Sequence, residues 1–265
     1  MARTILITSG KGGVGKTTSA INLAAALNLL GKKTLLIDSS LSADVGIHLG
    51  APTVPISLNS VLAGKSKASE AIYKHSSGLL IMPSSLNLHN INKVKLENLV
   101  KVIGEISRYA EFIIIDCAAG LGDEVLYAIN ASNEIIVVTN AEMPAIANAL
   151  KILQIARARG KIINGVIITK HGKHKNELSL ENIHNFLEER IIGIVPEDEA
   201  VSNALAQREI LVHSHPRSKA AISYKKIAAK LVGNKFESDE GFIEEDEKTK
   251  ENKGFFERLF NWINF

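Results

Sequence analysis

Short aliphatic runs recur along the chain and alternate with longer stretches whose apolar residues follow a helical period. The seven runs share a high content of β-branched residues and lie at positions 4–7, 34–37, 79–82, 112–115, 135–138, 166–168 and 192–195. Runs of this kind are typical of buried parallel strands. Helical patterns separate them, for example at 17–30 and 145–158. The pattern therefore predicts an α/β fold, with a mostly parallel twisted sheet covered by helices on both faces.

The regular pattern stops near residue 233, and the remaining chain has two parts of different composition. Residues 234–252 are acidic and polar with few apolar positions, which predicts a flexible linker. Residues 253–265 form a separate aromatic and apolar segment. We therefore expect a globular body over 1–233, an acidic linker over 234–252 and a C-terminal helix over 253–265.

The distribution of charge and the cysteine content bear on the partners and the cellular compartment of the protein. Residues 234–265 hold five basic and nine acidic side chains, whereas residues 1–233 hold 26 and 19. A mildly basic body can attract phosphates, anionic lipid or nucleic acid, but solvated surface lysines explain the excess equally well. The single cysteine, Cys117, cannot form an internal disulfide, which favours a reducing cytoplasm. The first predicted strand begins only a few residues after Met1, so no signal peptide is expected. No apolar run approaches the ~20 residues that span a bilayer, so no transmembrane helix is expected either.

A glycine-rich loop follows the first predicted strand and opens the first predicted helix. It fits the pattern G-x-x-x-x-G-K-[ST] and consists of Gly10, Lys11, Gly12, Gly13, Val14, Gly15, Lys16 and Thr17, with Thr18 completing the stretch. Glycines let the backbone turn its N–H groups toward an anion, and the helix N-terminus adds partial positive charge. We expect Lys16 to reach the β- and γ-phosphates and the Thr17 hydroxyl to bind Mg²⁺. The loop thus predicts a nucleotide-binding ATPase that uses ATP and Mg²⁺.

A second lysine inside this loop, Lys11, is either a solvated loop residue or a functional one. With it, the sequence Lys-Gly-Gly-Val-Gly-Lys-Thr resembles the deviant Walker A loop of the MinD/ParA family. The resemblance implies a homodimer that sandwiches ATP, in which Lys11 of each protomer reaches the phosphates bound by the other. There the lysine would stabilise the negative charge that develops during phosphoryl transfer, as an arginine finger does.

An aspartate, Asp38, ends the second aliphatic run. A carboxylate at this place can hold a Mg²⁺-bound water or orient the attacking water. In the MinD/ParA family the segment usually reads Asp-x-Asp, and the second Asp supports hydrolysis. Here Ser40 occupies that second position, and a hydroxyl cannot supply negative charge. We therefore expect slow hydrolysis, unless the nearby Asp44 substitutes for the missing carboxylate.

Another aspartate, Asp116, ends the fourth run and fits the Walker B pattern, in which a strand-end Asp acts on Mg²⁺ through water. The segment that follows, residues 117–122, resembles the family's switch segment. Its glycines, Gly120 and Gly122, allow the turn to move with the γ-phosphate. Cys117 within it is expected to be a small buried residue rather than a redox group.

Later segments resemble the parts of the family that surround the base. Residues 139–142 resemble its Thr-Asn-Pro-Glu segment, and Thr169-Lys170 stands where the family has a polar pair beside the base. Pro196-Glu197-Asp198 matches a turn whose backbone lines the adenine pocket. Lys170 either stacks on adenine or is a solvated residue at a strand end, and the sequence does not decide between the two.

The last thirteen residues hold five of the chain's aromatic side chains. The apolar positions lie at helical spacing on one face, with Trp262 near its boundary: Phe255, Phe256, Leu259, Phe260, Trp262 and Ile263. The segment is much too short to span a bilayer, and its composition predicts an interfacial helix on an anionic membrane surface. Docking on the body or on a partner protein is the alternative. The segment also resembles the membrane-targeting helix of the MinD branch of the family.

Three function classes follow from these observations. The first is a cytoplasmic ATPase, peripheral on the inner face of the cell membrane, that positions cell-division or other polar machinery with an unidentified regulatory or cargo protein. The second is a DNA-segregation ATPase of the ParA type that binds DNA non-specifically through its basic body. The third, an iron–sulfur relative that shares the loop, requires bridging cysteines, and one cysteine does not supply them.

Overall fold

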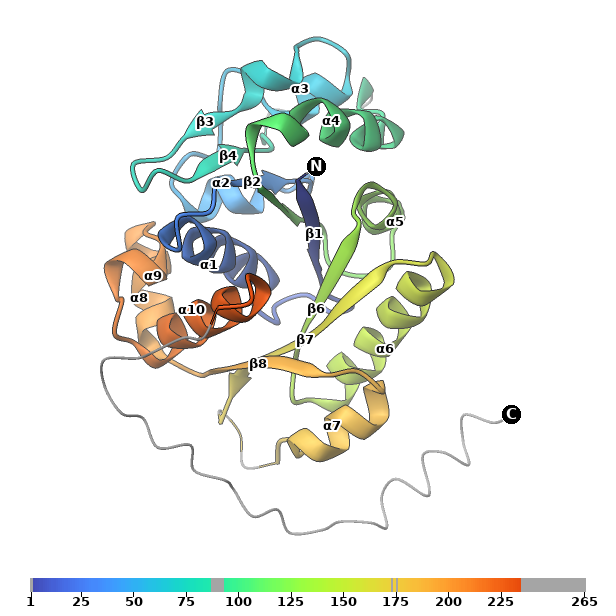
Figure 1. Cartoon of the computed structure of the whole chain (residues 1–265), viewed down its shortest axis with the longest axis vertical. Coiled ribbons are helices and arrows are strands. Elements are labelled where there is room, and N and C mark those ends of the chain that lie inside the picture. Colours follow the sequence, from blue (N-terminus) through green and yellow to red (C-terminus); the bar gives the residue numbers. More distant parts are fainter. Residues whose placement is uncertain (1, 87–92, 173, 175, 235–265) are drawn as a thin grey trace.

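The computed structural model describes residues 2–86, 93–172, 174 and 176–234. Its centre is one sheet whose strands, in chain order, are β1 (Arg3–Thr8), β2 (Thr34–Asp38), β3 (Tyr73–Lys74), β4 (Leu80–Met82), β5 (Phe112–Asp116), β6 (Glu134–Asn140), β7 (Ile162–His171) and β8 (Ile191–Pro196). Their spatial order is β3-β4-β2-β5-β1-β6-β7-β8 (Figure 1). All neighbouring strands are parallel except β3 and β4, which are antiparallel.

Each of the seven aliphatic runs corresponds to one parallel strand, so the predicted α/β fold is confirmed. The prediction missed β3, which has only two residues and lies at the edge of the sheet. Two residues are too few to show the alternation that identifies a half-buried strand. The strand forms because Tyr73 and Lys74 pair with Ile81 and Leu80 across a tight turn.

Helices cover both faces of the sheet (Figure 1). Those over one face are α1 (Lys16–Leu29), α8 (Glu199–Gln207), α9 (Leu211–Ser214) and α10 (Lys219–Leu231). Those over the other face are α4 (Leu99–Ile106), α5 (Asp123–Ala131), α6 (Met143–Ala158) and α7 (Leu180–Leu187). The shorter helices are α2 (Asp44–His48), α3 (Leu58–Leu62), and the 3-10 turns Ala68–Ala71, Leu96–Asn98 and Ser107–Tyr109.

Strand β1 lies in the middle of the sheet, between β5 and β6. Its side chains alternate between the two cores: Ile5 and Ile7 pack with α1 and α10, and Leu6 packs with the opposite helices. All three are fully buried, because parallel sheets are covered on both sides. Because β1 is held on both sides and on both faces, it fixes the position of the glycine-rich loop that follows its carboxyl end.

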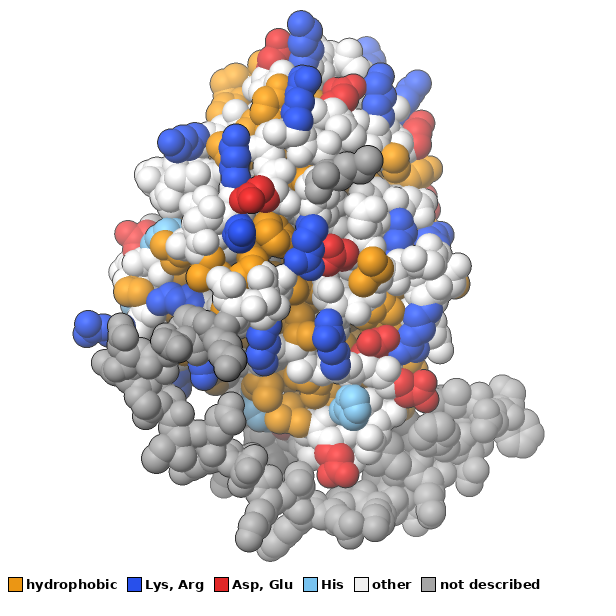
Figure 2. Space-filling model, in the orientation of Figure 1, with side chains coloured by type: hydrophobic (Ala, Val, Ile, Leu, Met, Phe, Trp, Pro, Cys, Tyr) orange, Lys and Arg blue, Asp and Glu red, His pale blue; other side chains and the backbone are white. Residues whose placement is uncertain are grey.

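The surface of the body carries dispersed charge. On the face seen in Figure 2, lysines and arginines are spread over the molecule with acidic side chains among them. Within the described ranges, no helix is both long enough and apolar enough to cross a membrane.

The last helix of the body, α10, ends at Leu231, close to the predicted boundary at 233. Residues 235–265 lie outside the described residues, and with them almost all of the predicted linker and the whole C-terminal helix. The division of the chain into three parts and the six membrane-facing residues therefore remain predictions.

Candidate functional site

The glycine-rich loop connects the buried end of β1 to the first turn of α1 at the carboxyl edge of the sheet. Gly13 and Gly15 have φ of 78° and 82°, the left-handed region that favours glycine. A Cβ on Gly10 would collide with the backbone of Asn148 in α6, whereas a Cβ on Gly12 would meet nothing within 4 Å. The fold itself thus requires Gly10, while the space over Gly12 lies open to a ligand that approaches the backbone.

Three predicted site residues meet at the start of α1. Lys16 Nζ lies 2.6 Å from Asp116 Oδ1, and the Thr17 hydroxyl donates to Asp116 Oδ2 at 2.8 Å. The Lys16 side chain is 7% exposed and that of Asp116 is fully buried. Burial lowers the pKa of Lys16, but the charge of Asp116 and its hydrogen bond to the lysine, with smaller contributions from neighbouring acidic groups, together outweigh burial and leave the pKa raised. The lysine therefore stays charged in the interior, where a phosphate can replace its carboxylate partner.

Asp38 lies directly beside Asp116, because the two residues are register partners on β2 and β5. Its carboxylate accepts hydrogen bonds from the backbone N–H of Ser40 at 3.1 Å and of Val45 at 3.0 Å. Burial, with the nearby charge of Asp116, raises the pKa of Asp38 to about 8. The side chain thus fixes the turn between β2 and α2, and its predicted role at Mg²⁺ remains a prediction.

Ser40 is buried in the same turn. Its hydroxyl lies 2.9 Å from the Ser42 hydroxyl and donates to Asp44 Oδ2 at 3.2 Å. Asp44, which the sequence suggested as a substitute for the second Asp, therefore reaches the position next to Ser40. It is the first residue of α2 and is half-buried.

Lys11 forms an ion pair that was not predicted from the sequence. Its Nζ lies 2.7 Å from Glu142 Oε2, and both side chains are about 40% exposed. The hydrogen bond from Lys11 lowers the pKa of Glu142. Glu142 directly precedes α6, next to the loop, because β6 is the neighbour of β1. The position of segment 139–142 at the end of a predicted strand places Glu142 at the edge of the sheet where the loop lies. The sequence does not pair it with Lys11, because the two residues are 131 positions apart.

The predicted residues beside the base hold the loop from the end of β7. The Thr169 hydroxyl contacts the carbonyl of Val14, and Lys170 Nζ donates to the carbonyl of Gly13 at 2.8 Å. Lys170 has a φ of 54°, unusual for a residue with a side chain. These contacts tie both residues to the phosphate loop. Whether Lys170 also stacks on a base remains a prediction.

The turn 196–198 stands two strands beyond β6, at the end of β8. Glu197 donates its backbone N–H to His171 O at 2.9 Å. The Asp198 carboxylate accepts from the backbone N–H groups of Ala200 and Ala220, so it caps α8 and joins it to α10. The Asp198 side chain is thus engaged in the fold. The predicted contact of Pro196, Glu197 and Asp198 with adenine stays a prediction.

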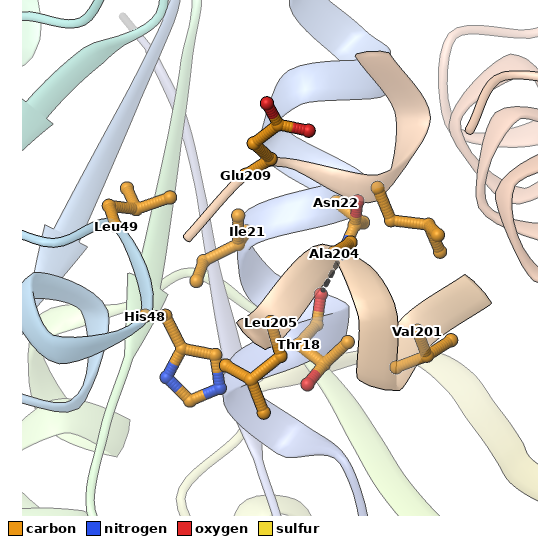
Figure 3. Close-up of a pocket in the computed structure, with 10 residues that line it drawn as sticks. Thr18, Ile21, Asn22, His48, Leu49, Val201, Ala204, Leu205 and Glu209 are labelled. Carbon is orange, nitrogen blue, oxygen red and sulfur yellow. Dashed lines mark hydrogen bonds between the residues drawn. The ribbon is translucent and has the colours of Figure 1, made fainter. Parts of the chain in front are cut away.

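Thr18 lines a separate small cavity, shown in Figure 3. The cavity lies where α1 meets His48 and Leu49 on one side and Val201, Ala204 and Leu205 of α8 on the other. The dashed line in the figure is the bond from Asn22 Nδ2 to Thr18 O, 2.8 Å long. The volume of about 20 Å³ holds about one water. A nucleotide does not fit in this volume, and the nucleotide contact expected of Thr18 remains a prediction.

Cys117 follows Asp116 and is fully buried, with Sγ 3.2 Å from Ala118 O. Burial raises the pKa of this thiol to about 12. We expect the native protein to react with a thiol reagent at pH 8 at least ~10²-fold more slowly than the urea-unfolded chain, because the thiolate is the reactive form. Colour release from Ellman's reagent measures both rates, with Cys117→Ser as the blank. Fast stoichiometric labelling of the folded protein would contradict this assignment.

A glycine-rich loop between a central parallel strand and a helix, with a lysine, a threonine and a strand-end aspartate in contact, defines a P-loop nucleotide-binding protein. Comparison with protein families agrees with this class. A family model described as an AAA domain matches residues 2–166. A second, described as 4Fe-4S iron sulfur cluster binding proteins of the NifH/frxC family, matches residues 100–249.

Known proteins similar over nearly their whole length define the family. An uncharacterised ATP-binding protein of Methanocaldococcus jannaschii is 40% identical over 97% of this chain and 98% of its own. The septum site-determining protein MinD of Neisseria meningitidis is 31% identical over 98% and 99%. The structure of MinD from Pyrococcus horikoshii complexed with Mg-ADP superposes with a TM-score of 0.84, at 32% identity, over 87% of this chain and 96% of that one. The chain belongs to the MinD/ParA family of P-loop ATPases.

The similarity to iron–sulfur proteins does not extend to cluster ligands. The chain has one cysteine, and its thiol is buried against the backbone of the switch segment. One thiolate per chain is fewer than the cysteines that hold such clusters in known sites.

Proposed function

We propose that this chain is an ATP hydrolase that binds ATP with Mg²⁺, pairs with a second copy around the nucleotide, and thereby controls its residence on a membrane. The observation that carries the proposal is the contact of Lys16 and Thr17 with Asp116 at the open glycine-rich loop. A charged amine, a hydroxyl and a buried carboxylate are the donor set that nucleotide-bound Mg²⁺ and its phosphates require.

In the proposed reaction, Lys16 exchanges the carboxylate of Asp116 for the β- and γ-phosphates. Asp116, freed from Lys16, would then hold a water of the bound Mg²⁺, and the Thr17 hydroxyl, which donates to Asp116 in this structure, would bind the ion. When bound, Mg²⁺ neutralises charge on the phosphates. The loop N–H groups around Gly12 and Gly13 hold the phosphates in position, and the first turn of α1 adds its partial positive charge.

Pairing of two copies is supported by the exposed position of Lys11. Its side chain is 41% exposed, and among the described residues its amine is held only by Glu142, on the rim of the loop. A surface ion pair of this kind contributes little stability, so Lys11 can leave it at small cost. In the homodimer, Lys11 would reach the phosphates of the other protomer, as the family resemblance implies.

Membrane residence would come from residues 253–265. One short amphipathic helix binds lipid weakly, and two copies on one dimer gain avidity of ~10²–10⁴ from effective concentration. ATP-dependent pairing would therefore place the protein on the inner face of the cell membrane, and hydrolysis would return it to the cytoplasm. A regulatory or cargo protein would act on this cycle.

Sedimentation with anionic vesicles tests the switch. We expect the full chain to pellet severalfold more with ATP than with ADP, and Phe256→Glu to stay in the supernatant with either nucleotide, because the charge removes one apolar anchor. Asn261→Gln, a conservative change at a polar position of the same segment, serves as the matched control. Equal pelleting of the unaltered chain with both nucleotides would rule out the switch.

Non-specific DNA binding is the second candidate, supported by the 26 basic against 19 acidic residues of the body. Retardation of random-sequence DNA that weakens steeply with salt would favour it.

A further inference from the structure

We propose that Asp44 supplies the carboxylate that orients the attacking water, in place of the acidic residue absent at Ser40. The inference rests on the proposed ATP hydrolysis and names a further residue for it. A site with Ser40 alone offers the water only a hydroxyl, which carries no negative charge.

The turn between β2 and α2 places Asp44 beside Ser40. Ala43 adopts the left-handed conformation, with a φ of 55°, and reverses the chain so that α2 starts at Asp44. The backbone N–H of the next residue, Val45, donates to Asp38 at 3.0 Å, which anchors the first turn of α2 to the end of β2. The Ser40 hydroxyl then donates to Asp44 Oδ2 at 3.2 Å. Backbone and side chain are thus both fixed.

The charge of Asp44 acts on the groups around the phosphate position. It contributes to raising the pKa of Lys16, Asp38, Asp116 and Glu124, which come from α1, β2, β5 and α5. Its contribution is the smallest of those that shift each pKa, so the Asp44 carboxylate lies within electrostatic range of all four groups. The hydrogen bond to Ser40 fixes the position of the carboxylate, and its influence on these groups is consistent with that position.

Accessibility separates Asp44 from the other two aspartates. Asp38 and Asp116 are fully buried and accept hydrogen bonds from backbone or side-chain donors. Asp44 is only half-buried, and its Oδ2 accepts a hydrogen bond from the Ser40 hydroxyl. Of the three aspartates, Asp44 is the least buried, which suits a side chain that must meet a water molecule.

The step this residue would support is the attack of water on the γ-phosphorus. The water oxygen forms a new bond to phosphorus, and the bond from phosphorus to the bridging oxygen of ADP breaks. Asp44 accepts a hydrogen bond from the water and takes its proton, which then passes to the released phosphate. ATP and water are thus converted to ADP and phosphate with no further reactant. Ser40 acts as a positioning residue, since its hydroxyl holds Asp44.

Hydrolysis by three variants of the full chain tests the proposal: Asp44→Asn, Ser40→Asp and the double variant. We expect Asp44→Asn to lower the single-turnover rate by about 10²-fold, because it removes the acceptor for the water proton. Its ATP affinity, measured by calorimetry, should stay within about twofold, since the loop and Lys16 remain. Ser40→Asp should restore most of the rate in the double variant. Glu97→Gln, an exposed change in the 3-10 turn Leu96–Asn98, is the control.

Two outcomes would overturn the proposal. One is unaltered turnover in Asp44→Asn with a folded protein, and the other is a Ser40→Asp rate gain that is the same with Asp44 or Asn at position 44. Absence of turnover in the unaltered chain would overturn it as well. Failure of the proposed membrane switch gives a different result, because vesicle sedimentation would then be independent of nucleotide while the effect of Asp44→Asn on hydrolysis persists.

Discussion

A Lys16→Met variant is expected to lose ATP hydrolysis by roughly 10³-fold, together with most of its affinity for ATP. The amine is the buried cation that would exchange Asp116 for the phosphates, and methionine keeps the length of the side chain without its charge. Calorimetric titration with ATP and Mg²⁺, and release of phosphate in a single turnover, measure the two losses. ATP affinity within about threefold of the unaltered chain would contradict the assignment of the loop.

The same variant also tests the buried ion pair. Without Lys16, the Thr17 hydroxyl is the one side-chain donor left to the Asp116 carboxylate in the part of the chain that the structure describes. Breaking a buried pair typically lowers the free energy of unfolding by about 3 kcal/mol. Adding Asp116→Asn should recover most of this stability in urea denaturation without recovering ATP binding. That divergence separates loss of a ligand contact from loss of the fold, because a variant that merely misfolds would recover both or neither.

A Lys11→Ala variant is expected to hydrolyse ATP about 10³-fold more slowly while it keeps ATP affinity within a few-fold. The reason is that a cation supplied by the second protomer acts on the transition state rather than on nucleotide binding by one chain. Size-exclusion chromatography with light scattering, in a slowly hydrolysed ATP analogue, should show a dimer for the unaltered chain and a monomer for the variant. Turnover per molecule of the unaltered chain should rise with protein concentration.

Glu142→Gln provides the matched control for this experiment. It releases Lys11 from its 2.7 Å ion pair but leaves the lysine in place. We expect it to pair and hydrolyse at least as well as the unaltered chain, since the exposed ion pair stabilises the fold little. Lys11→Ala turnover equal to that of the unaltered chain, or a rate independent of concentration, would contradict action across a dimer.

The sheet was predictable because its strands are buried on both faces. The strands β1, β5 and β6 read as continuous aliphatic runs, and no other local structure explains seven such runs at intervals filled by helical patterns. Strand β3 was not predicted because no periodic pattern marks it. It pairs with β4 through a turn in which the backbone N–H of Gly78 donates to His75 O.

Some residues of the candidate site were likewise predictable from the sequence, and some contacts between them were not. The residues of the glycine-rich loop are contiguous, and the strand-end position of Asp116 follows from the carboxyl edge of a parallel sheet. The contacts of Lys11 with Glu142 and of Lys170 with Gly13 join segments more than one hundred residues apart. Such pairings depend on which strands are neighbours, and a single sequence carries no signal of the order β1-β6-β7. The closeness of Asp44 to Ser40 was suggested by sequence, but its orientation depends on the left-handed Ala43.

The central position of β1 has a consequence for synthesis of the chain. The first strand made pairs with residues 112–116 on one side and 134–137 on the other. At typical translation rates it waits on the order of ten seconds for these partners to emerge from the ribosome. During that interval Ile5, Leu6 and Ile7 lack the strands that flank them in the folded sheet. The glycine-rich loop that follows them is then not held by the sheet. Both neighbouring strands of β1 therefore become available only after about half of the chain has been synthesised.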